Sequence, residues 1–237
     1  NFKINQGQIF GMLGPNGVGK STIFNLITGL ISPQSGKIKI QGNSLEGLRS
    51  SYIKEIEDFD AIFECLSKHF DRMPIINLIG HSRGGGIALL QSKNKNISRI
   101  ASWAGISSIK NRFPNKEKLN EWKQKRIRFV KNGRTNQNMP HSYSQYKDFL
   151  LHQERLNIET YCKTSTIPTL IVHGENDTSV LPSEVEALSN WLNTSPVIIK
   201  ETQHTFGSAQ PWEKEQMPQA LKKACEVTLS FFQTVES

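Results

Sequence analysis

The chain has 237 residues, and 29 Lys and Arg against 21 Asp and Glu give it a formal net charge of +8. Hydrophobic residues make up 36% of the sequence, with 12 Phe and four Trp, which excludes a chain that is disordered throughout. No apolar run reaches the roughly 18 residues of a membrane-spanning helix, so we expect no transmembrane segment. The length allows one large domain or two small ones.

The positive charge is concentrated in one segment. Ten Lys and Arg lie between Lys110 and Arg134, against only Glu117 and Glu121, and the rest of the chain is close to neutral. A nucleic-acid partner is therefore not expected, because such a surface collects basic residues from several elements. The three cysteines are far apart, which predicts free thiols. Together with the lack of a signal-peptide pattern, they predict a cytoplasmic protein, although the chain starts with Asn1 rather than at an initiator Met.

Apolar spacing and turn residues predict the secondary structure. The first 45 residues indicate a strand over 8–13, a glycine loop, a helix over 21–30 and a strand over 37–41. Alternating strands and helices from about 53 to 235 predict an α/β fold with a mostly parallel sheet and helices on both faces. These later elements are helix 53–69, strand 75–79, helix 85–90, strand 97–104, helix 146–159, strand 169–173, helix 184–192, strand 196–200 and helix 218–233.

A glycine-rich loop between the first strand and the first helix fits G-x-x-x-x-G-K-[ST]. In such a loop backbone N–H groups turn towards phosphate oxygens. Lys20 is expected to reach the β- and γ-phosphates, and Ser21 to ligate Mg²⁺. The predicted nucleotide-binding residues are Gly14, Asn16, Gly17, Gly19, Lys20, Ser21 and Thr22.

Residues 7–22, followed by Pro33, Gly36 and Gly42, resemble the ATP-binding subunit of ABC transporters over residues 1 to about 45. The resemblance implies ATP and Mg²⁺ as cofactors and a transporter membrane subunit as partner. That family also has an LSGGQ-type signature, an Asp-Glu pair closing an apolar strand, a glutamine loop and a switch histidine, and none is present later in this chain. The alternative interpretation is a fragment that holds phosphate weakly and cannot power transport.

A second motif, Gly80-His81-Ser82-Arg83-Gly84, fits G-x-S-x-G between an apolar strand and a helix. In this nucleophile elbow the serine occupies a strained turn, so we expect Gly80 and Gly84 to be required as small residues. The side chain of Ser82 is then expected to stand above the C-terminal edge of the sheet.

A nucleophilic serine needs a histidine base and an orienting carboxylate. Asp177 follows the strand 169–173 and His204 follows the strand 196–200, so both are expected at the same sheet edge as Ser82. We therefore predict a Ser82–His204–Asp177 triad. Glu175 is the weaker acid candidate, and His173 is interpreted as a packing residue at the end of its strand.

The strings Gly-His-Ser-Arg-Gly-Gly, His-Gly-Glu-Asn-Asp and His-Thr-Phe-Gly resemble the α/β-hydrolase family, in its dienelactone-hydrolase-like and prolyl-peptidase-like esterase branch, over roughly 50–237. The resemblance implies hydrolysis of small carboxylic esters or related acyl compounds without a cofactor, and an oxyanion hole that includes the Arg83 backbone N–H. It also implies a cap over the active site at about 105–165. For the basic segment within it, we weigh a cationic lid for anionic substrates against a solvated helical surface.

The predicted organisation has an incomplete P-loop unit over 1–45 and an α/β-hydrolase portion over 46–237. The family's first strands and second oxyanion donor are not found in the sequence, so we expect impaired activity and an exposed apolar edge at strand 75–79. We also predict that strand 8–13 pairs in parallel beside it. The alternatives to a serine hydrolase are an ATP-binding transporter fragment, and a chimeric chain joined at about 43–55 with neither activity intact.

Overall fold

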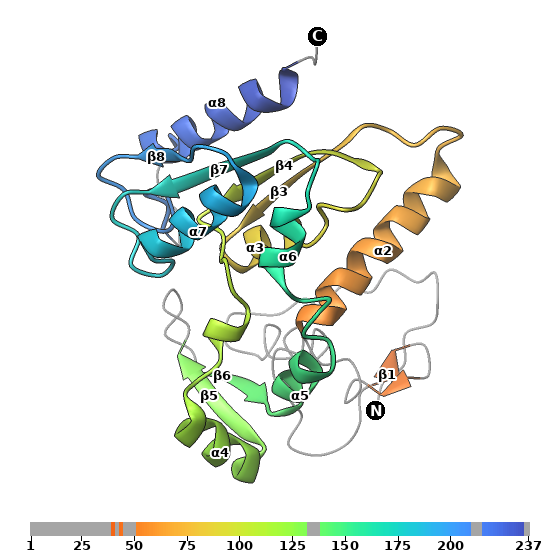
Figure 1. Cartoon of the computed structure of the whole chain (residues 1–237), viewed down its shortest axis with the longest axis vertical. Helices are drawn as coiled ribbons and strands as arrows, with labels where there is room; N and C mark the ends of the chain where they lie inside the picture. The colour runs from red at the N-terminus through yellow and green to blue at the C-terminus, as the bar shows by residue number, and fades with distance from the viewer. Residues whose placement is uncertain (1–38, 41–42, 45–50, 132–137, 210–214, 235–237) are drawn as a thin grey trace, which may run out of the picture.

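The computed structural model describes residues 39–40, 43–44, 51–131, 138–209 and 215–234 (Figure 1). All predicted nucleotide-binding residues, Gly14 to Thr22, lie outside these ranges. The strand over 8–13 does too, so its pairing with strand 75–79 stays a prediction. Of the N-terminal part, the description includes a short antiparallel pair, β1 (Lys39–Ile40) and β2 (Asn43–Ser44).

A four-stranded parallel sheet forms the centre of the described fold, in the order β3-β4-β7-β8. This confirms the predicted α/β class with a mostly parallel sheet. Because the strands run in one direction, the loops that follow them all emerge at one edge. The strands are β3 (Ile76–His81), β4 (Ile97–Trp103), β7 (Thr169–Gly174) and β8 (Val197–Ile199).

Helices cover both faces of this sheet, and strand alternation assigns neighbouring residues to opposite faces. Ile171 packs into a core with α2, α3, α6 and α7, whereas Val172 packs into a second core with Ala224 of α8 (Figure 1). Four of the predicted helices are confirmed within a few residues at their ends: α2 (Tyr52–His69), α3 (Arg83–Leu89), α7 (Pro182–Leu192) and α8 (Gln219–Gln233). The sheet is also covered by the short helix α6 (Ile158–Lys163).

Strand β3 forms one edge of the sheet within the described residues, where it pairs only with β4. Ile76 and Leu78 face the core, but Ile79 is 55% exposed and Ile75, just before the strand, is 84% exposed. The apolar edge predicted from the sequence is therefore confirmed.

The segment between β4 and β7, here called the cap (residues 105–165), differs from its prediction. The basic segment is not a helical surface throughout: its helix α4 ends at Lys125, the next residue, Arg126, has a φ of 61°, and the chain continues as an antiparallel strand pair. The predicted helix 146–159 is split in two, α5 and α6, and the Asn157 side chain caps the second. The cap elements are η2 (Lys110–Arg112), α4 (Lys116–Lys125), β5 (Ile127–Lys131), β6 (Asn138–Ser142) and α5 (Ser144–Leu151).

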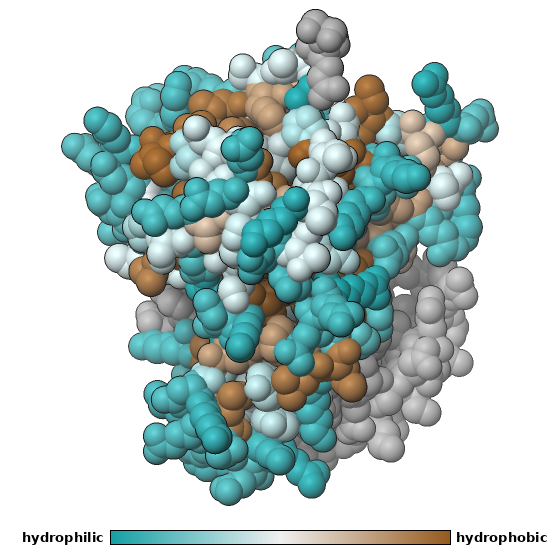
Figure 2. Space-filling view, in the orientation of Figure 1, coloured by the Kyte–Doolittle hydropathy of each residue, from teal (hydrophilic) through white to brown (hydrophobic). Residues whose placement is uncertain are grey.

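Aromatic rings hold the cap together. Trp122 of α4 is almost fully buried, and Phe113 has its ring centroid 4.9 Å from Phe149 and 5.0 Å from Tyr146. Hydrophilic side chains cover much of the cap surface, with apolar residues among them (Figure 2). None of the helices in the described ranges has the length and apolarity that a bilayer crossing requires.

Candidate active site

Ser82 occupies the turn between β3 and α3 in a conformation that L-residues rarely adopt, with φ 58° and ψ −120°. Such a conformation costs about 1–3 kcal/mol and persists only where its surroundings hold it. The Ser82 N–H donates to the Trp103 carbonyl at 2.8 Å, and the Ser82 carbonyl accepts from Gly85, Gly86 and Ile106 at 3.0, 3.3 and 3.2 Å. Bonds to β4, to α3 and to the following loop thus hold the serine at the sheet edge.

The glycines around Ser82 have different steric roles. A Cβ added to Gly80 is 2.1 Å from the carbonyl oxygen of Gly84, so Gly80 is required. A Cβ added to Gly84 meets no heavy atom within 4 Å, so the prediction that Gly84 must be small is wrong. The close approach lies one residue later, because a Cβ on Gly85 is 2.7 Å from the Cα of Gly105.

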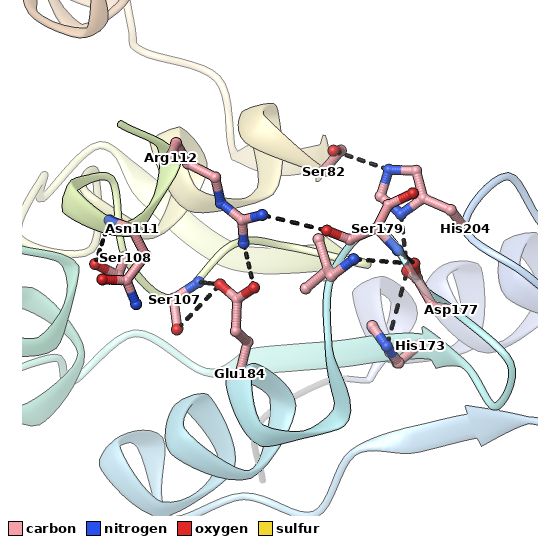
Figure 3. A network of polar contacts seen from close by, with 11 residues as sticks. Ser82, Ser107, Ser108, Asn111, Arg112, His173, Asp177, Ser179, Glu184 and His204 are labelled. Carbon is pink, nitrogen blue, oxygen red and sulfur yellow. Dashed lines mark hydrogen bonds and ion pairs between the residues drawn. The ribbon is translucent and has the colours of Figure 1, made fainter. Parts of the chain in front are cut away.

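Ser82, His204 and Asp177 meet in one hydrogen-bonded chain (Figure 3). His204 Nε2 lies 2.9 Å from Ser82 Oγ, and His204 Nδ1 lies 2.7 Å from Asp177 Oδ2. Because an ionised carboxylate only accepts, Nδ1 carries the proton and Nε2 offers its lone pair to the Ser82 hydroxyl. This arrangement suits removal of the serine proton by an imidazole.

Asp177 is held as an acceptor by the backbone of its own loop. Its Oδ1 accepts from the N–H groups of Ser179 and Val180 at 2.7 and 3.0 Å, and the residue is only 3% exposed. Burial is the largest influence on the Asp177 pKa and raises it, but the hydrogen bonds from His204 and the two N–H groups together outweigh burial. The pKa is therefore held below its usual value, and the carboxylate stays charged at neutral pH.

The His204 loop is fixed by a residue that the sequence reasoning did not select. His81, the second residue of the elbow motif, donates through Nε2 to the His204 carbonyl at 2.8 Å, and the two rings lie 4.7 Å apart. Phe206 then packs edge-on against His81. Glu175, the weaker acid candidate, accepts instead from the Glu201 N–H at 2.9 Å, so it anchors this loop rather than binding the imidazole.

His173 is a buried neighbour of Asp177. The side chain is 2% exposed, as expected for a packing residue, and its Nε2 is 3.8 Å from Asp177 Oδ2, too far for a hydrogen bond. Burial lowers the pKa of His173, although the nearby Asp177 carboxylate opposes that effect. A neutral imidazole is therefore favoured beside the charged carboxylate.

Arg83 contributes through both its backbone and its side chain. Among the described residues its N–H has no recorded acceptor, so the first-turn N–H remains available beside Ser82. Its guanidinium forms a two-point ion pair with Glu55 of α2, at 2.9 and 2.6 Å, and lies 3.9 Å from the Tyr52 ring centroid. Burial raises the pKa of Glu55, with Arg83 acting in the opposite direction. The sequence offered no local signal for this link, because 28 residues separate the partners.

A second charged pair joins the cap to the acid loop (Figure 3). Arg112 forms an ion pair with Glu184 of α7, and its Nη1 donates to the Ser179 carbonyl at 3.2 Å. Glu184 also accepts from the N–H and hydroxyl of Ser107, at 3.0 and 3.2 Å. These bonds connect the first residues of the cap to the loop that positions Asp177.

Within the described ranges no group of three or more His, Cys, Asp or Glu side chains is arranged to hold a metal ion. The residues predicted to bind ATP and Mg²⁺ lie outside those ranges.

The sequence of this chain is similar to ATP-binding proteins of transporters. The ABC transporter family model matches residues 1–139. The branched-chain amino acid transport ATP-binding protein BraF of Pseudomonas aeruginosa is 44% identical over 48 residues, which are 20% of this chain and 19% of BraF. The thiamine import ATP-binding protein ThiQ of Vibrio vulnificus is 27% identical over 129 residues, which are 54% of this chain and 51% of ThiQ. The chain therefore spans between 19% and 51% of the length of these two relatives.

The fold of this chain, in contrast, is similar to solved structures of an esterase and a lipase. Est1E from Butyrivibrio proteoclasticus aligns with a TM-score of 0.53 at 16% identity, covering 78% of this chain and 72% of Est1E. A monoacylglycerol lipase of Paleococcus ferrophilus aligns with a TM-score of 0.54 at 14% identity, covering 76% and 75%. The fold is that of the α/β hydrolases. The ABC transporter match extends well past residue 45, where the sequence resemblance was expected to end, into residues that the structure folds in this way.

The different roles of Gly80 and Gly84 give a matched test. We expect Gly80→Ala to unfold the elbow or lose soluble protein, because its Cβ would lie 2.1 Å from a backbone oxygen. Gly84→Ala should fold with a melting temperature close to wild type. Circular dichroism melts of the two variants check this, and equal destabilisation by both would contradict the assignment.

The lowered pKa of His173 predicts that the folded protein loses stability in acid. Its folded-state pKa lies below the unfolded value of about 6.5, so the unfolded chain binds more protons and stability falls as pH drops through that value. His141, whose pKa burial also lowers, contributes in the same direction. Urea unfolding at pH 7.5 and 5.5 should show a smaller acid loss in His173→Gln than in wild type. An unchanged acid loss in the variant would refute the prediction.

Proposed function

By its match over residues 1–139 the chain belongs to the ABC transporter family, and we propose that the chemistry of its described residues is nevertheless that of a serine hydrolase acting on carboxylic esters. The observation that carries this proposal is the hydrogen-bonded chain from Ser82 through His204 to Asp177, at 2.9 and 2.7 Å. A strained serine, a base and an ionised acid at one sheet edge are the parts that acyl transfer needs.

The proposed reaction has two halves. His204 Nε2 takes the Ser82 proton as Oγ attacks the ester carbonyl carbon, and the same proton then passes to the departing alcohol as the C–O bond breaks. His204 next takes a proton from a water whose oxygen attacks the acyl-Ser82 carbonyl. The bond from that carbon to Oγ then breaks, His204 returns the proton to Oγ, and the carboxylic acid is released. Asp177 stabilises the imidazolium that forms in each half without itself taking the proton.

Charge that develops on the carbonyl oxygen needs donors in place beforehand. The Arg83 N–H is the one donor proposed here. A missing second donor typically costs about 10²–10³ in rate, so we propose a slow enzyme for small acyl substrates. In this proposal residues 46–237 form the hydrolase unit with its cap over 105–165, and residues 1–45 form a separate P-loop unit.

Labelling with a fluorophosphonate probe tests the nucleophile. Wild type should become labelled at Ser82, Ser82→Ala should not react, and Asp177→Asn should react orders of magnitude more slowly because the imidazole loses its fixed tautomer. Ser67→Ala, an exposed serine on α2, is the control and should label like wild type. Equal labelling of wild type and Ser82→Ala would reject the assignment.

The family match favours a second candidate, ATP binding at residues 14–22, with Lys20 holding phosphate and Ser21 binding Mg²⁺. A transporter membrane subunit is the partner under this alternative. Equilibrium dialysis with labelled ATP and Mg²⁺ should then detect binding that Lys20→Ala abolishes and Ser82→Ala retains. Absence of binding in the wild type rejects this candidate, and failure of both assays would favour a chimeric chain with neither activity.

A further inference from the structure

A row of aromatic rings links two arginines from different parts of the sequence. Arg83 lies over the Tyr52 ring and Arg128 over the Trp122 ring, and Phe113 contacts both rings at centroid distances of 6.2 and 6.4 Å. Burial raises the pKa of Tyr52, and all three arginines act against it. This cluster, here called the arginine cluster, consists of Arg83, Arg112 and Arg128.

The three arginines differ in how their charge is balanced. Arg83 pairs with Glu55 and Arg112 with Glu184, whereas Arg128 has no recorded carboxylate partner within the described ranges. The rest of the chain offers few candidates. The acidic residues outside those ranges are Glu46, Glu213 and Glu236, and the segment 132–137 that follows β5 contains none.

Arg128 is also partly removed from water. Its guanidinium lies 4.1 Å from the centroid of the Trp122 ring, and its Nε is buried without a hydrogen-bond partner among the described residues. Burial lowers the pKa of Arg128, which means that the surroundings disfavour its charge. The residue paired with Arg128 across the hairpin is His141, which supplies no negative charge to balance the guanidinium. A desolvated cation without a counter-charge is stabilised when an anion binds to it.

Two of the three arginines are joined to the segments that carry the reacting groups. Arg83 directly follows Ser82 in the elbow, and Arg112 binds the Ser179 carbonyl in the loop that holds Asp177. The guanidinium of Arg112 points from the cap towards that loop (Figure 3). These links place positive charge of the cap next to the loops that hold Ser82 and Asp177.

We propose that Arg128 and its neighbours in the arginine cluster bind an anionic group, of the carboxylate class, carried by the acyl ester that reacts at Ser82. This rests on the proposed hydrolase function and names its substrate class: monoesters of dicarboxylic acids or similar acyl compounds with a free carboxylate. Arg83 and Arg112 contribute positive potential, while the guanidinium of Arg128, which has no ion pair among the described residues, makes the charge-assisted hydrogen bond.

The test compares two esters that differ in one charge, 4-nitrophenyl hydrogen succinate and its methyl ester. Arg128→Gln should lower kcat/KM for the anionic ester by about tenfold or more and change the neutral one little. Lys131→Gln is the matched control, because it removes the same charge from an exposed position on the same strand. It should leave the preference for the anion unchanged. Arg128→Met keeps an apolar stem over Trp122 and replaces the Gln variant if that one does not fold.

Equal loss of preference in the Arg128 and Lys131 variants, or no loss in Arg128→Gln, overturns the site. If wild type hydrolyses neither ester, binding decides, because it does not need a working nucleophile. Calorimetry on Ser82→Ala with monomethyl succinate and dimethyl succinate should then show tighter binding of the anion. A further Arg128→Gln change should abolish that difference, which leaves the anion site standing and rejects hydrolysis. The same affinity for both compounds rejects the anion site itself.

Discussion

The backbone conformation of Ser82 is the constraint on which the rest of the site depends. A positive φ at a serine is held here by hydrogen bonds to β4, to α3 and to the loop after β4, and it fits only because Gly80 has no Cβ. Asp177 follows β7 and His204 follows β8 of the same parallel sheet. One strand direction therefore brings three residues spread over more than 120 positions within hydrogen-bond distance.

Electrostatics decides which form each of these groups takes. Two backbone N–H groups and the imidazole keep Asp177 charged although it is buried, and a charged Asp177 fixes the proton of His204 on Nδ1. Two nearby cations are also stabilised by specific partners: Arg83 forms an ion pair with Glu55, and Arg112 with Glu184. Arg128 departs from this pattern, because it has no ion pair among the described residues, and the anion site proposed above rests on that difference.

The sheet and the proximity of Ser82, His204 and Asp177 could be predicted from the sequence because their signals are local. These are an apolar strand, a glycine turn, and an acid and a histidine directly after later strands. The hairpin of the cap could not, since Ile127 and Val130 gave too short an apolar pattern within a basic segment to separate strand from helix. The roles of His81 and of the Arg83–Glu55 pair were also missed, because they arise from contacts between residues far apart in sequence. The tolerance at Gly84 depends on the local backbone path, which a motif does not encode.

The ABC transporter match runs to residue 139 and so extends across the elbow, into the part of the chain that folds as a parallel sheet with helices on both faces. The exposed side chains of Ile75 and Ile79 lie on the strand that ends in Gly80 and Ser82. Exposed apolar edges invite pairing. Any segment that pairs there bonds to the strand carrying the nucleophile, so the stability of the elbow and the occupancy of that edge are physically coupled.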